Sequence, residues 1–93
     1  MRVLLAGDSL SIQQVCDALH VRPADVSVVE HVRTEGELFL SLRQHQPDVV
    51  VVDRLVRPDA PATWFEYLQT LSQHSQLLWV DRGQVTKFKP IGR

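Results

Sequence analysis

The chain of 93 residues contains little cysteine and no long hydrophobic run. Its single cysteine, Cys16, cannot form an internal disulfide bond, which agrees with a reducing compartment and makes the cytoplasm the expected location. No apolar run approaches the length of about 20 residues that a membrane-spanning helix needs. The composition, 44% hydrophobic and 23% charged, is typical of a globular protein, and the length allows a single domain.

Motifs for several kinds of binding site are also missing. A loop that cradles phosphate after the first strand would need several glycines, and Gly7 alone does not provide them. The four histidines have no metal-ligand spacing and are expected on surfaces; they are His20, His31, His45 and His74. These absences argue against a glycine-rich nucleotide site and against a histidine metal site.

Charge is distributed unevenly along the chain. All 11 acidic residues lie at or before Asp81, whereas the last twelve residues carry four bases and no acid. A short basic end of this kind is typical of a solvated terminus, and no aromatic residues interleave it to form a nucleic-acid surface. We therefore expect one α/β domain over residues 1–81 and a basic strand or tail over residues 82–93, with no nucleic acid as a partner.

Four consecutive valines at residues 49–52 form the most informative stretch, and Asp53 follows them directly. β-Branched side chains favour a strand, and the lack of alternation indicates that both faces of this strand are covered. That is typical of a central strand in a parallel sheet. Asp53 is then expected at the carboxyl end of a buried strand, where open α/β folds bind their ligands.

The remaining apolar patterns alternate between strand and helix. Strands are expected over residues 3–6, 26–32 and 77–80, and helices over about residues 10–20, from Thr34 to before Pro47, and along Trp64, Phe65, Leu68 and Leu71. Ser9, Thr34 and Thr63 are the expected N-caps, the last two with a glutamate three residues later. The order predicts a parallel sheet with right-handed crossovers, after which residues 85–88 fold back as an antiparallel strand.

Two acids, Asp8 and Asp53, each follow an apolar strand. If these strands are neighbours, the carboxylates converge at the edge where the sheet topology reverses. Paired carboxylates suit Mg²⁺, and a carboxylate can also accept a phosphoryl group. Lys89 is the candidate for neutralising the charge that develops there. Arg54 and Arg57, close to Asp53 in the chain, are expected to form a salt-bridged rim.

Several short stretches, in this order and spacing, resemble the receiver domain of bacterial response regulators. Residues 2–8 are similar to its first strand and acidic pocket, and residues 35–38 with 42–43 to its second helix. Residues 47–53 are similar to its third strand, and residues 88–90 to the lysine–proline pair after its fifth strand. The main resemblance covers about residues 1–80.

The resemblance implies a three-layer, flavodoxin-like α/β fold with parallel strand order 2-1-3-4, to which the alternating residues 85–88 add the C-terminal strand. It implies that Asp53 is the phosphoacceptor, that Asp8 and Asp53 hold Mg²⁺, and that Lys89 faces the phosphoryl charge. The expected function is that of a signalling module of the two-component type. Such a module is not an enzyme; it binds a kinase or an output protein and is switched by phosphorylation at Asp53.

The sequence departs from the family pattern at several points. Gly7 stands where the family usually has the second of two adjacent acids, and Val80-Asp81 provides no hydroxyl after strand four. The segment before Lys89 is too short for a fourth helix, and no fifth helix follows Pro90. These departures leave an alternative open, a pseudo-receiver that works without phosphorylation as a dimerisation or docking unit.

The two missing helices also predict an exposed surface. In the order 2-1-3-4, the first helix covers one face of the sheet, and the second and third helices cover the other. Strands three and four would then be bare on the first face, where Val50, Val52 or their neighbours would form an apolar patch with Leu78 or Trp79. Monomers rarely leave such a patch open, so a homodimer or a docked partner helix is expected.

A remote alternative comes from Gly7-Asp8-Ser9-Leu10, which matches the opening motif of GDSL esterases. There the serine is the nucleophile and needs a late Asp and His to activate it. The only Asp-x-x-His pair, Asp17 and His20, falls inside the first predicted helix, too early in the chain.

Overall fold

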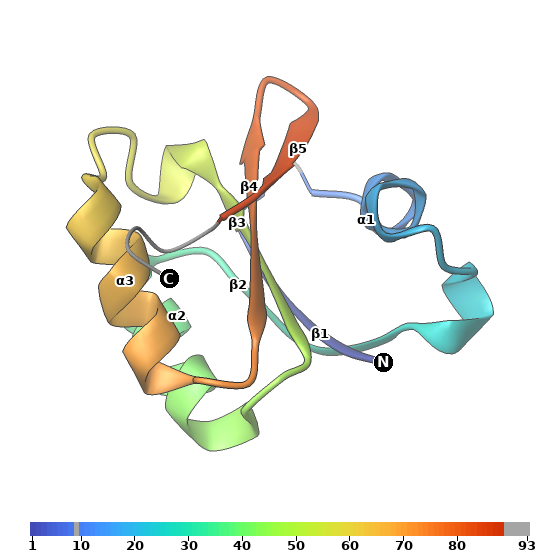
Figure 1. Ribbon diagram of the computed structural model, residues 1–93, viewed down its shortest axis with the longest axis horizontal. Coiled ribbons are helices and arrows are strands. Elements are labelled where there is room, and N and C mark those ends of the chain that lie inside the picture. The colour runs from blue at the N-terminus through green and yellow to red at the C-terminus, as the bar shows by residue number, and fades with distance from the viewer. Residues whose placement is uncertain (9, 89–93) are drawn as a thin grey trace.

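The computed structural model describes residues 1–8 and 10–88, which form a five-stranded sheet in the order β2-β1-β3-β4-β5 (Figure 1). The strands are β1 (Arg2–Ala6), β2 (Ser27–Val32), β3 (Val49–Asp53), β4 (Gln76–Asp81) and β5 (Gln84–Lys87). β1 to β4 are mutually parallel, and β5 pairs antiparallel with β4. The predicted α/β class, the order 2-1-3-4 and the added C-terminal strand are confirmed.

The helices form two layers around the sheet. α1 (Ile12–Leu19) lies on one face, whereas α2 (Glu35–His45) and α3 (Ala62–Leu71) lie side by side on the other (Figure 1). Two short 3-10 turns, η1 (Pro23–Asp25) and η2 (Arg54–Val56), complete the connections. In the part of the chain that the structure describes, no helix has the length and apolar character required to cross a membrane.

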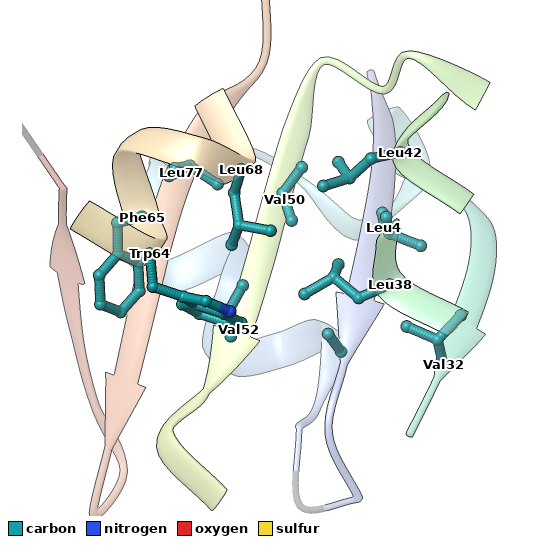
Figure 2. Close-up of a cluster of buried hydrophobic side chains, with 11 residues drawn as sticks. Leu4, Val32, Leu38, Leu42, Val50, Val52, Trp64, Phe65, Leu68 and Leu77 are labelled. Carbon is teal, nitrogen blue, oxygen red and sulfur yellow. The ribbon is translucent and has the colours of Figure 1, made fainter. Parts of the chain in front are cut away.

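β3 is the central strand, as the valine run predicts. It pairs with β1 on one side and β4 on the other, and all five of its residues are buried. Val50 and Val52 face α2 and α3, where Leu38 and Leu68 pack against them (Figure 2). Val49 and Val51 belong to the second apolar cluster, on the α1 side, so the strand has a core on each face.

The exposed apolar patch predicted on the α1 face is wrong. Val50 and Val52 point to the opposite face and are 0% exposed. Leu78 does face α1, but it is only 1% exposed, and Trp79 is half-buried against Phe65 with ring centroids 4.4 Å apart. Partly buried side chains pack over the α1-face cluster in place of a fifth helix; they are Leu10, Ile12, Leu19, Val26 and Val85. The argument for a homodimer through this patch therefore no longer holds.

Only one of the two threonines predicted to cap a helix does so. Thr34 caps α2, because its Oγ1 accepts a hydrogen bond from the Glu37 backbone N–H at 3.2 Å. Thr63 does not cap α3, because that helix begins at Ala62 and already contains it. At α1 the cap is Ser11, which accepts from the Gln14 N–H; the predicted cap Ser9 lies outside the described residues.

The two threonines make a matched test of this difference. We expect Thr34→Ala to lower the free energy of unfolding by about 1 kcal/mol, because the Glu37 N–H loses its partner. Thr63→Ala should change it by less than about 0.5 kcal/mol, since Thr63 is exposed and caps nothing. Urea unfolding followed by circular dichroism measures both, and equal costs would contradict the assigned helix starts.

Candidate functional site

The carboxyl ends of β1 and β3 lie side by side, as predicted. Ala6 is in register with Val52, so Gly7 lies next to Asp53 at the same edge of the sheet. The two residues pack unusually closely: a Cβ added to Gly7 would lie 2.4 Å from the Asp53 Cβ. Gly7 also has φ of +135°, a conformation that residues with a side chain rarely adopt. Glycine is therefore the residue that this contact requires.

Asp53 is a buried carboxylate with a structural role. It is 7% exposed, and its Oδ1 accepts a hydrogen bond from the Leu55 backbone N–H at 2.9 Å. This contact makes Asp53 the N-cap of η2. Within residues 1–8 and 10–88, no side chain forms an ion pair with Asp53.

Asp8 has a different partner. Its Oδ1 lies 3.1 Å from Nε of Arg33, and its side chain is 73% exposed. Arg33 follows β2, which lies on the far side of β1 from β3. The described residues also include no group of three His, Cys, Asp or Glu side chains that could hold a metal ion. The described partner of Asp8 is therefore Arg33, and the two-carboxylate Mg²⁺ site stays a prediction.

Lys89 lies outside the described residues, but the direction of β5 bears on its predicted role. Gln84 is opposite Asp81 at the carboxyl edge, and Phe88 donates its N–H to the Leu77 carbonyl at 3.0 Å. By Phe88 the chain has therefore run back along β4, away from the edge that holds Asp53. The described part of β5 gives no support to a lysine facing the Asp53 carboxylate.

The arginine rim predicted beside Asp53 is confirmed. Arg54 Nη1 lies 3.0 Å from Oδ2 of Asp81, and Arg57 Nη1 lies 3.5 Å from Oε2 of Glu35. The Arg57 guanidinium also lies over the Trp64 ring, 5.8 Å from its centroid. These contacts connect η2 and the loop after it to β4, α2 and α3.

A cavity of about 470 Å³ opens at the carboxyl ends of β3 and β4. Three parts of the chain enclose it: α1, the segment that begins at Asp53, and the turn between β4 and β5. Its lining residues are Gln14, Asp53, Arg54, Leu55, Pro58, Val80, Asp81, Arg82 and Gly83. Sequence reasoning missed Gln14, Asp81 and Arg82, although Asp81 follows the apolar residues of β4 much as Asp53 follows the valines of β3.

The remaining predicted features have ordinary structural partners. Asp17 accepts a hydrogen bond from Gln13 Nε2 at 2.8 Å within α1, and His20 ends that helix, while Ser9 lies outside the described residues. His45 Nε2 lies 3.0 Å from Oε2 of Glu30.

A scan against protein-family models finds no match, and searches of curated proteins and of solved structures find none either.

Proposed function

We propose that this chain is a regulatory module with a receiver-like, flavodoxin-like fold, which acts by binding another protein and is not phosphorylated at Asp53. The sheet order, the helix layers and the acid at the end of the central strand support the receiver-like architecture. The resemblance of residues 2–8 and 47–53 to receiver domains supports action through a protein partner.

One observation favours the version without phosphorylation. The Asp53 side chain packs against Gly7, at the position where receivers usually have a second acid. Attack on a phosphodonor needs an accessible carboxylate oxygen and a cation beside it. Asp53 is 7% exposed, one of its oxygens caps η2, and the nearby Asp8 pairs with Arg33. The carboxylate thus fits a structural role better than that of a nucleophile.

The test is incubation of the full chain with acetyl phosphate and Mg²⁺, followed by intact-mass spectrometry. We expect no gain of a phosphoryl group, because one Asp53 oxygen already caps η2 and Asp8, the other predicted Mg²⁺ ligand, pairs with Arg33. A receiver domain of established activity, treated in parallel, shows that the donor is competent. A base-labile mass gain in the wild type that Asp53→Asn removes would restore the phosphorylation-switched alternative.

A further inference from the structure

The cavity at the ends of β3 and β4 has the construction of a binding site. Its walls come from segments far apart in the chain, and polar contacts hold them together. Gln14 Nε2 donates to the Gly83 carbonyl at 2.8 Å, tying α1 to the β4–β5 turn, and the Arg54–Asp81 pair ties η2 to β4. The cavity lies on the edge of a parallel sheet where open α/β folds bind ligands, and its volume is in the range of small-molecule sites.

The charges of the lining indicate what could bind. Asp53 as a residue is 7% exposed, and among residues 1–8 and 10–88 its carboxylate has one hydrogen bond, from the Leu55 N–H. A buried charge is costly unless an opposite charge accompanies it. The nearest arginine in the chain, Arg54, pairs with Asp81 instead. Asp53 is therefore a carboxylate at the cavity wall with capacity for a further, cationic donor.

We propose that this cavity binds a small molecule with a primary ammonium group, which donates to the Asp53 carboxylate. An ammonium group provides one positive charge and three N–H donors. Leu55, which is 73% exposed, with Pro58 and Val80, provides apolar contact for the carbon atoms attached to it. A simple anion would find Arg82 in the lining, since Arg54 pairs with Asp81, but it would leave the Asp53 carboxylate without an opposite charge. This proposal is independent of the protein-binding function.

Arg82 lines the same cavity, and its guanidinium should distinguish two kinds of ligand with an ammonium group, a simple amine and a free amino acid. A simple amine would use Asp53 and the apolar residues alone. A free amino acid would also place its carboxylate near the guanidinium of Arg82. A guanidinium can bind a carboxylate with two parallel hydrogen bonds. Propylamine and L-leucine are therefore the two probes, with butyrate as the anionic control and Mg²⁺ as the inorganic cation.

The experiment is a titration of the ¹⁵N-labelled full chain, read from the backbone amide signals of Leu55, Asp81 and Gly83. We expect saturable shifts with propylamine, and tighter binding of L-leucine if Arg82 takes part. Asp53→Asn should weaken propylamine binding at least about tenfold, because the charge is lost while an oxygen remains to cap η2. Asp59→Asn is the matched control, since Asp59 is in the same loop, 91% exposed and not part of the lining.

A second variant covers the case in which Asp53→Asn does not fold. Leu55→Ser alters an exposed side chain at the cavity, so the fold should be retained and propylamine binding should weaken several-fold. The proposal is overturned if neither amine gives saturable shifts, if butyrate or Mg²⁺ gives the same shifts as propylamine, or if Asp53→Asn binds as tightly as the wild type.

Discussion

Replacing Gly7 by alanine is expected to lower the free energy of unfolding by about 2–4 kcal/mol. Two costs add together. The new Cβ would lie 2.4 Å from the Asp53 Cβ, so β1 and β3 would have to move apart at their carboxyl ends. The backbone would also have to keep φ at +135°, which is strained for any residue with a Cβ. Urea unfolding of the two proteins measures the difference.

Two further variants separate these costs. In an Asp53→Gly background the steric conflict is gone, so Gly7→Ala should cost clearly less, and what remains reports the backbone strain alone. Gly36→Ala is the matched control, because a Cβ there meets nothing within 4 Å and Gly36 lies in α2. It should raise stability by up to about 1 kcal/mol. If Gly7→Ala were as mild as Gly36→Ala, the close packing of Gly7 on Asp53 would be wrong.

Leu68→Ala is expected to lower the free energy of unfolding by about 2–5 kcal/mol. Leu68 is 0% exposed and lies between α3 and the sheet, close to Val50 (Figure 2). Truncation removes buried apolar contact and leaves a cavity, because close-packed neighbours relax only partly into the vacated space.

The control for this variant is another helical leucine. Leu40 lies in α2 but is 57% exposed, so Leu40→Ala should change the free energy of unfolding by less than about 0.5 kcal/mol. Both variants are measured by urea unfolding with circular dichroism. Similar costs for the two would contradict the assignment of Leu68 to the core between the helices and the sheet.

The layout of the sheet could be predicted from the sequence because its main signal is chemical and local. Four valines in a row need cover on two faces, and only a central strand provides that. The expected exposed patch was wrong because the pattern says that a face is apolar but does not say what covers it. Here α1 and the side chains around it, including Val85 of β5, complete a layer that two missing helices were expected to leave open.

The candidate site was harder to predict because two sequence features after β4 predict different paths for the chain. Arg82 and Gly83, with φ of +51° and +81°, form the two-residue turn that reverses the chain after β4. That turn produces the predicted antiparallel strand, which runs away from Asp53. The lysine expected from the receiver resemblance would need a strand that ends at the Asp53 edge. These two expectations conflict, and the described residues follow the turn.

The helix caps show the same limit on a smaller scale. Thr34 and Thr63 have the same spacing to a following glutamate, yet only Thr34 begins its helix. Pro61 is the N-cap position of α3, so the helix already includes Thr63 in its first turn. A capping pattern identifies a residue that is able to cap a helix. The residue at which the helix begins also depends on the conformation of the preceding loop.

The central claim is that Asp53 is a structural carboxylate packed on Gly7. Its most direct test is a ¹³C-resolved nuclear Overhauser spectrum of the full chain. We predict strong cross-peaks between the Gly7 α-protons and the Asp53 β-protons, together with cross-peaks between the paired residues Ala6 and Val52 of β1 and β3. If the Ala6 and Val52 signals connect the two strands but Gly7 and Asp53 give no cross-peak, the Asp53 side chain lies elsewhere and the account is contradicted.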